Sequence, residues 1–149
     1  MERTFVMLKP DAVSRGLMGE IISRFERKGL KMVAAKFMEI TEDIAAEHYA
    51  EHLEKPFYPK LLDFITSGPV LAMVWEGEDA IRVVRAIVGK TDPTEALPGT
   101  IRGDYGMIKT MNLIHASDSP ESAEREIAIF FSPDQLIDWE RSDRNWLSF

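Results

Sequence analysis

The histidines are the side chains of this sequence best suited to moving a proton or a chemical group near neutral pH. An unperturbed imidazole has a pKa of about 6.5, so neutral and charged forms are both accessible there. Two of them, His48 and His52, lie four residues apart, and His115 stands far along the chain. The two places predict different chemistry.

The first pair matches a metal-binding pattern. His48-Tyr49-Ala50-Glu51-His52 has the form H-x-x-E-H of the inverted zinc peptidases, which on a continuous helix would put both imidazoles on one face. The same residues are also typical of a solvated helix rich in glutamate and histidine, and the sequence identifies no third zinc ligand. A zinc peptidase that binds stoichiometric zinc is therefore one alternative.

The remaining histidine lies in an apolar segment that predicts a strand over residues 112–117. Period-two alternation puts His115 and Ser117 on one face of that strand. A histidine on a buried strand is ordinarily a hydrogen-bonded core residue. However, Asp118-Ser119-Pro120 begins a helix whose N-terminal amides can attract anions, and Glu126 in that helix could reach back to fix the imidazole tautomer. Core and catalytic interpretations both stand on this segment alone.

Two glycine-containing segments could bind phosphate. Gly89-Lys90-Thr91 resembles the end of a P-loop, but Val84 stands where the first glycine is needed and the triplet follows a predicted helix, so a Walker motif is excluded. Residues 99–106 are rich in glycine and would be ordinary turns without Arg102 between the glycines. Arg102 makes this segment a candidate for binding an anion.

These residues depend on a frame of short strands and amphipathic helices. Apolar runs predict strands at 4–9, 31–40, 70–75 and 112–117. Helical spacing with proline, glycine and capping residues predicts helices at 10–28, from Thr41 onward, around 61–66, at 78–88 and from Pro120, with a last short helix at Ser132-Pro133. The order indicates an α+β, ferredoxin-like domain: a βαββαβ core whose four-stranded antiparallel sheet is covered by helices on one face.

The stretch from Lys90 to Met111 has little periodicity, and such a long loop in a compact domain is usually functional or disordered. One capped turn is expected at residues 92–95. The C-terminal segment carries Trp139, Trp146 and Phe149, which we expect to pack over another surface.

Composition bounds the class of protein. A chain of 149 residues, 45% hydrophobic and 29% charged, suits one globular domain over residues 1–149. The absence of cysteine excludes disulfides and cysteine catalysis and fits a cytoplasmic protein. A net charge of -7 argues against a nucleic-acid binder, although a local group of cations could still bind a small anion. We expect no signal peptide and no membrane span, because the longest apolar run is only Val70 to Trp75.

The segment Asn112-Leu113-Ile114-His115-Ala116-Ser117-Asp118 resembles the active-site signature N-x-x-H-x-S-D of the nucleoside diphosphate kinases. Other landmarks of that family occur in the same order: Thr4 to Asp11, Glu47 to Tyr49, Lys55 to Phe57, Ser67 to Val70, and Pro98 to Asp104. Several motifs in family order are stronger support than one short pattern.

This resemblance implies a ferredoxin-like fold and a ping-pong transfer of the terminal phosphate of a nucleoside triphosphate to a nucleoside diphosphate, through a phosphohistidine at His115. Mg²⁺ would bridge the nucleotide phosphates without a protein ligand set of its own. The chain would form a homo-oligomer, a hexamer or tetramer, and the long loop would bind nucleotide and contact other subunits. The implied nucleotide-binding residues are Lys9, Phe57, Arg85, Thr91, Arg102 and Asn112, and the supporting residues are Tyr49, Ser117 and Glu126.

The implied roles within this set differ. Phe57 would stack on the base and so tolerate both purines and pyrimidines, Tyr49 would lie beside the phosphates and ribose, and Ser117 and Glu126 would support the histidine. Lys109 and Met111 depart from the family pattern in the loop, so base preference stays open. Ala12 and Ala116, where the family often has glycine, are smaller changes.

A catalytically silent nucleotide-binding or interaction module of the same fold is the second alternative. Such a module is expected to have lost His115 or the cations that face phosphate. This sequence retains both.

Overall fold

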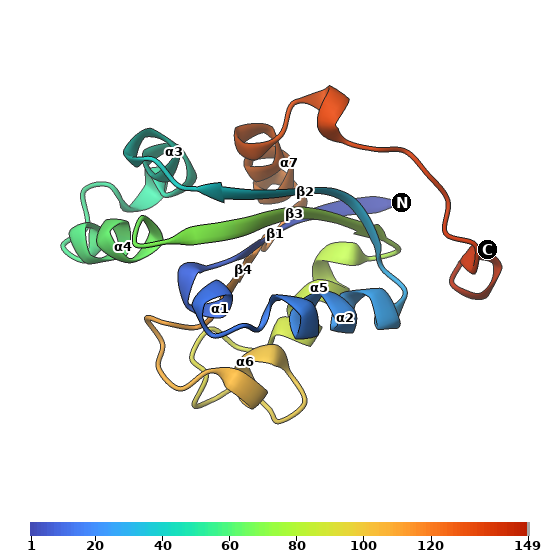
Figure 1. The fold of residues 1–149 in the computed structure, drawn as a ribbon, viewed down its shortest axis with the longest axis horizontal. Helices are drawn as coiled ribbons and strands as arrows, with labels where there is room; N and C mark the ends of the chain where they lie inside the picture. The colour runs from blue at the N-terminus through green and yellow to red at the C-terminus, as the bar shows by residue number, and fades with distance from the viewer. Residues whose placement is uncertain (149) are drawn as a thin grey trace.

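A single antiparallel sheet organises the computed structural model, which describes residues 1–148 (Figure 1). Its strands are β1 (Glu2–Leu8), β2 (Lys31–Glu39), β3 (Pro69–Gly77) and β4 (Ile114–Ala116), in the order β2-β3-β1-β4. Every neighbouring pair is antiparallel. The predicted α+β, ferredoxin-like fold is confirmed, and the strand that leads to Lys9 lies beside the strand that carries His115.

Helices cover the sheet on both faces (Figure 1). They are α1 (Pro10–Ser14), α2 (Met18–Lys28), α3 (Glu42–His48), α4 (Tyr58–Ile65), α5 (Ala80–Val88), α6 (Ile101–Tyr105) and α7 (Pro120–Phe130), with short 3-10 turns η1 (Ala50–His52), η2 (Pro133–Gln135) and η3 (Arg144–Trp146). The expectation of helices on one face was wrong. Along β1, Val6 and Leu8 belong to one buried cluster with α2 and α5, while Phe5 and Met7 belong to a second cluster with α3, α4 and α7.

The first predicted helix is interrupted. A continuous helix over 10–28 was expected, but α1 ends at Ser14 and α2 begins at Met18. Between them Gly16 has a φ of 71°, a left-handed conformation that ends an α-helix. Gly29 ends α2 as predicted, with a φ of 109°.

Other boundaries follow local chemistry. The imperfect alternation of the second predicted strand has a cause, because β2 changes register against β3 between Met32 and Ala34. The side chains of Thr41 and Ser119 cap α3 and α7 as predicted, accepting hydrogen bonds from Ile44 N (3.2 Å) and Ser122 N (3.1 Å). Helix α4 begins earlier than predicted, because Pro59 stands in its first turn instead of breaking it.

The long segment from Lys90 to Met111 is ordered around α6, which the sequence did not predict. Thr100 Oγ1 caps this helix by accepting a hydrogen bond from Gly103 N at 3.0 Å. The capped turn at residues 92–95 forms, with Asp92 Oδ1 accepting from Thr94 N at 3.0 Å, but it does not continue into a helix. Helix α6 brings Arg102 toward β4.

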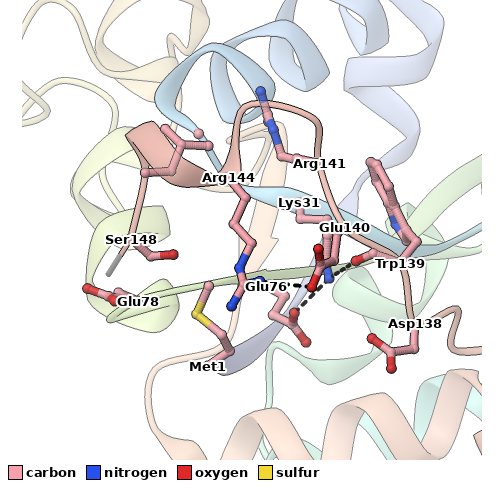
Figure 2. A pocket seen from close by; sticks show the side chains of 12 residues that line it. Met1, Lys31, Glu76, Glu78, Asp138, Trp139, Glu140, Arg141, Arg144 and Ser148 are labelled. Atoms are coloured by element: carbon pink, nitrogen blue, oxygen red, sulfur yellow. Dashed lines mark hydrogen bonds and ion pairs between the residues drawn. The ribbon is translucent and has the colours of Figure 1, made fainter.

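The C-terminal segment runs from α7 along β2 and back to the end of α2 (Figure 1). Trp139 Nε1 donates to the Met32 carbonyl at 2.8 Å, and Arg141 donates to the Leu30 carbonyl at 2.8 Å. A pocket of about 370 Å³ lies under this segment around the ion pair of Lys31 and Glu76 (Figure 2). The predicted packing of the C-terminal tryptophans over another surface is only partial.

Within this segment Trp139 is 43% exposed and Trp146 is 89% exposed, while Phe149 lies outside the described residues. No described helix combines the length and apolarity needed to cross a membrane.

Candidate active site

His115 lies in the middle of β4, directly opposite Met7 of β1. Its side chain is 25% exposed, so it is not the fully buried core histidine that the segment alone allowed. On the inner side, its ring contacts His48 edge-on, with ring centroids 4.7 Å apart. The pairing of β4 with β1 over three residues fixes the backbone of His115, and its imidazole lines a pocket of about 180 Å³.

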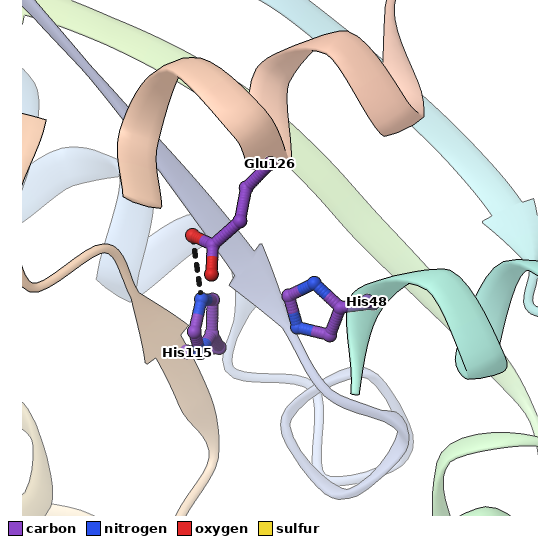
Figure 3. A group of neighbouring side chains, drawn as sticks. All are labelled: His48, His115 and Glu126. Atoms are coloured by element: carbon purple, nitrogen blue, oxygen red, sulfur yellow. Dashed lines mark hydrogen bonds and ion pairs between the residues drawn. The ribbon is translucent and has the colours of Figure 1, made fainter. Parts of the chain in front are cut away.

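A buried carboxylate from α7 holds this imidazole. Glu126 Oε1 lies 2.9 Å from His115 Nε2 and accepts a hydrogen bond from Ser117 Oγ at 2.6 Å (Figure 3). Burial by itself raises the pKa of Glu126, but the hydrogen bonds and charge of His115 and the Ser117 hydroxyl outweigh it, so the pKa lies below its usual value.

An ionised carboxylate can only accept, which assigns the imidazole tautomer. In a neutral His115 the proton is therefore on Nε2, directed at Glu126, and Nδ1 keeps its lone pair. No hydrogen bond to Nδ1 is formed within residues 1–148. Ser117 and Glu126, the predicted supporting residues, thus hold the imidazole through Nε2, and Nδ1 has a free lone pair.

Cationic side chains gather near the same strand. Lys9, directly after β1, donates from Nζ to Asn112 Oδ1 at 2.9 Å. Burial, together with the charge of Arg102, lowers the pKa of Lys9 to about 8. A desolvated ammonium of this kind is stabilised by any anion that binds beside it.

Arg102 was predicted to bind phosphate, but in the structure its side chain also holds the backbone of neighbouring segments. Its side chain is buried and donates to three backbone carbonyls: Asn112 at 3.2 Å, Gly89 at 3.1 Å and Ile114 at 2.5 Å. Burial and the nearby charge of Arg85 lower the pKa of Arg102 to about 10. A guanidinium has five N–H donors, so Arg102 can fasten the long loop to β4 and still offer donors to an anion.

Two further predicted residues join this group through the backbone. Arg85, on α5, donates to the Ala116 carbonyl at 3.0 Å. Buried Asn112 donates from Nδ2 to the Thr91 carbonyl at 3.0 Å, so it connects Lys9 with the start of the loop. Thr91 itself is exposed. The structure thus brings together the predicted residues Lys9, Arg85, Thr91, Arg102 and Asn112.

The predicted aromatic residues Tyr49 and Phe57 lie in the segment that joins α3 to α4. Phe57, just before α4, is 48% exposed, and its ring centroid is 5.3 Å from that of His52. Tyr49 follows α3 and contacts His48 edge-on at 4.6 Å between centroids. Burial raises the pKa of Tyr49, and its hydroxyl has no hydrogen-bond partner in the described chain.

The helix expected for a zinc peptidase does not form. Helix α3 ends at His48, the chain turns at Tyr49, and His52 belongs to the separate turn η1. His48 instead lies with His115 and Glu126, the one group of at least three potential metal ligands found among the described residues. The zinc-peptidase interpretation of the H-x-x-E-H pattern was therefore wrong.

Sequence reasoning also missed a strained residue beside the histidine. Leu113 is fully buried and has a φ of 77°, in the left-handed region that costs a branched side chain free energy. Asp11 Oδ2 accepts from Leu113 N at 3.0 Å, and the Leu113 carbonyl accepts from Lys9 N at 2.9 Å. Asp11 within the Thr4 to Asp11 motif was the available signal, but its partner is 102 residues away.

Comparison with known proteins concerns the whole chain. A family model described as nucleoside diphosphate kinase matches residues 2–136. Among curated relatives, the nucleoside diphosphate kinase of Archaeoglobus fulgidus is 62% identical over 147 residues, covering 99% of this chain and 97% of the relative. That of Bacillus licheniformis is also 62% identical over 147 residues, covering 99% of both.

Solved structures give the same result. The halophilic nucleoside diphosphate kinase of Halobacterium salinarum in complex with CDP has a TM-score of 0.96 and 59% identity, covering 99% of both chains. A nucleoside diphosphate kinase family protein from Babesia bovis has a TM-score of 0.96 and 55% identity, covering 99% of this chain and 100% of that one. The family model and these relatives match the chain over nearly its whole length, and the chain has the predicted signature and a histidine held by a carboxylate. This chain therefore belongs to the nucleoside diphosphate kinase family.

Proposed function

We propose that this protein transfers the terminal phosphoryl group of a nucleoside triphosphate to a nucleoside diphosphate through a phosphohistidine at His115. The observation that carries the proposal is the hydrogen bond of 2.9 Å between His115 Nε2 and the buried Glu126 carboxylate, which leaves Nδ1 as the nucleophile. Membership of the nucleoside diphosphate kinase family supports the same reaction.

In the first half-reaction, the Nδ1 lone pair of His115 attacks the γ-phosphorus in line. The Nδ1–P bond forms while the bond from phosphorus to the bridging oxygen breaks, and the diphosphate leaves with that electron pair. Positive charge develops on the imidazole, and the Glu126 carboxylate at Nε2 stabilises it. The second half-reaction reverses these steps with a different diphosphate as acceptor.

The cations near β4 would compensate the phosphate oxygens. Lys9, Arg85 and Arg102 come from three distant segments and converge through their contacts with Asn112 and the β4 backbone. Asn112 and Thr91 supply polar groups for the phosphates and ribose. Such preorganised charge is the main requirement of phosphoryl transfer, because the protein performs little covalent chemistry of its own.

The base would stack on the exposed ring of Phe57. Every base presents a π-face, so stacking tolerates both purines and pyrimidines. The solved Halobacterium relative in complex with CDP supports a pyrimidine nucleotide as one substrate. Lys109 is exposed in the loop and could modify the preference.

A divalent cation is expected to arrive with the nucleotide phosphates. Mg²⁺ prefers oxygen ligands and commonly binds through substrate phosphates. The one candidate ligand group in residues 1–148 contains two imidazoles, which does not suit Mg²⁺. Bound between phosphates, this ion would neutralise developing negative charge.

We propose three further properties: a single domain over residues 1–149, assembly as a homo-oligomer (hexamer or tetramer) and a cytoplasmic location. The family model spanning residues 2–136 supports the first. The family resemblance supports the second, which sedimentation equilibrium measures, and the cysteine-free sequence supports the third.

Labelling tests the reaction directly. Incubation with γ-labelled ATP should label His115, and later addition of a different nucleoside diphosphate should move the label to the new triphosphate. His115→Ala should show neither step. An unlabelled wild-type protein would favour the silent nucleotide-binding module instead, and equal labelling of the variant would show that a residue other than His115 accepts the phosphoryl group.

A further inference from the structure

His48 has an unusual position for a histidine that the proposed reaction does not use. It is 5% exposed, and within residues 1–148 neither Nδ1 nor Nε2 has a hydrogen-bond partner. Burying a polar group without a partner costs free energy. Apolar aromatic residues could fill the same space against Phe5 and Phe130, whose ring centroids lie 6.0 and 5.6 Å from that of His48. Packing alone therefore does not explain an imidazole here.

The unpartnered imidazole faces two other potential ligands. His48 from α3, His115 from β4 and Glu126 from α7 converge, and one ligand atom from each lies within 4.8 Å of the others (Figure 3). Two imidazoles and a carboxylate are the protein ligand set of many zinc sites with an open fourth position. Tetrahedral zinc with bonds of about 2.0–2.1 Å holds its ligand atoms about 3.3 Å apart. The 2.9 Å between His115 Nε2 and Glu126 Oε1 is close to that spacing.

A pocket of about 180 Å³ adjoins the cluster and gives the fourth position access to water. Its lining includes all three side chains together with Asp118 and Arg125. Imidazole ligands favour zinc and neighbouring transition metals over Mg²⁺. The cluster therefore has the ligand type and the access that a divalent transition metal needs, and its ligand atoms, which lie up to 4.8 Å apart, must move closer together to bind one.

We propose that His48, His115 and Glu126 bind a divalent transition-metal ion, with Zn²⁺ the best match, and that this ion inhibits phosphoryl transfer. The inhibitory part rests on the proposed function. A metal bound at Nε2 of His115 takes the lone pair of that nitrogen, so the single proton of the neutral ring must lie on Nδ1. Nδ1 then has no lone pair with which to attack phosphorus, and Glu126 no longer stabilises Nε2–H.

Metal binding is measured first, on the full chain without nucleotide. Zn²⁺ is titrated in competition with a chromophoric chelator, and Co²⁺ is added separately because tetrahedral Co²⁺ has visible absorption bands. Wild-type protein should bind one equivalent per chain and give the tetrahedral Co²⁺ spectrum. His48→Phe should weaken Zn²⁺ binding by more than about 100-fold, because loss of a ligand should exceed the roughly 10- to 100-fold effect that is typical of outer-shell changes.

His52→Phe is the matched control, because this second histidine belongs to η1 and not to the ligand group. It should bind Zn²⁺ like wild type. His48→Gln serves as a second variant if His48→Phe fails to fold by circular dichroism. Absence of stoichiometric binding by wild type, equal binding by the folded His48 variants, or loss of binding in His52→Phe would each overturn the proposal.

Inhibition is then measured as His115 labelling by γ-labelled ATP in excess Mg²⁺, with and without one equivalent of Zn²⁺. Labelling of wild type and His52→Phe should fall at least about tenfold at saturation, while the His48 variant should keep its own zinc-free rate. Zn²⁺ bound to ATP affects all three proteins equally. If zinc binds but labelling is unchanged, the inhibitory role is wrong; if labelling fails without zinc, the proposed function fails while the binding result stands.

Discussion

At the scale of single residues, the buried Glu126 carboxylate determines which nitrogen of His115 can react. Its hydrogen bond fixes the proton on Nε2, and in the proposed reaction its charge would stabilise the imidazolium that develops during transfer. Ser117 fixes Glu126 in turn, through a hydrogen bond of 2.6 Å. The two effects can be separated by substitution.

Glu126→Gln keeps an oxygen that can accept from Nε2 but removes the charge. We expect the rate of phosphohistidine formation to fall about 10- to 100-fold with little change in nucleotide affinity, because the lost interaction strengthens only in the transition state. Single-turnover labelling gives the rate, and Ser117→Ala, which leaves the charge in place, should lose less. A wild-type rate in Glu126→Gln would contradict the electrostatic role.

Most of the candidate residues stand at positions within quoted motifs, whereas Arg85, Thr91 and Glu126 lie outside them and were proposed from the family resemblance over the whole chain. The motifs did not reveal His48 as a neighbour of His115, because that contact joins α3 to β4 across the face of the sheet. Nor did they reveal the left-handed backbone of Leu113, which depends on hydrogen bonds with Lys9 and Asp11 more than a hundred residues earlier.

At the scale of elements, α6 positions Arg102 and depends on close packing at a glycine. A Cβ at Gly103 would lie 2.0 Å from the Leu97 carbonyl oxygen, well inside van der Waals contact. The backbone of α6 therefore approaches the preceding turn more closely than any side chain allows. Arg102 lies on this helix, so its hydrogen bonds to three backbone carbonyls depend on the position of α6.

Gly103→Ala should consequently destabilise the protein by about 1–3 kcal/mol through overpacking and raise the KM for nucleotide as Arg102 shifts. Urea denaturation and steady-state kinetics measure the two effects. Gly19→Ala, in α2 with nothing within 4 Å of the added Cβ, is the control and should stabilise by about 0.5–1 kcal/mol. Equal stability of the two variants would mean that α6 tolerates displacement.

Most elements were predictable, because capping residues, prolines and apolar runs act locally. Thr41 and Ser119 start helices by accepting hydrogen bonds from amides of the first turn, and Gly29 ends one. These signals depend on residues that are close in the sequence, so they can be recognised without the fold. The break at Gly16 and the helix α6 were missed, because a left-handed glycine within a periodic pattern and a five-residue helix carry too little periodicity. Tertiary contacts decide such short elements.

At the scale of the whole molecule, the partly buried Lys9 links stability to pH. Its pKa falls from 10.5 in the unfolded chain to about 8 in the fold, so between these values the unfolded chain holds a proton that the folded chain lacks. Stability from this group is present above pH 10.5 and is lost as pH falls through about 8. The fold thus bears a cost at neutral pH, which an anionic ligand would relieve.

Measured by urea denaturation without nucleotide, the unfolding free energy of wild type relative to Lys9→Met should rise by up to about 1 kcal/mol per pH unit between pH 8 and pH 9.5. The exposed Lys109→Met removes the same charge from the surface and should run parallel to wild type. A constant difference between wild type and Lys9→Met would show that Lys9 is ionised in the fold throughout this range.

The position of β1 at the centre of the sheet has a consequence for synthesis of the chain. All seven residues of β1 pair with β3, which ends at Gly77, and its last three pair with β4, in which Ala116 pairs with Val6. At about 5–20 residues per second, the ribosome needs roughly 5–20 s to make the residues between Val6 and Ala116. Throughout that time the apolar segment Phe5-Val6-Met7-Leu8 lacks its full set of partners. We therefore expect the nascent chain to expose apolar surface to chaperones until β4, the strand that carries His115, has left the exit tunnel.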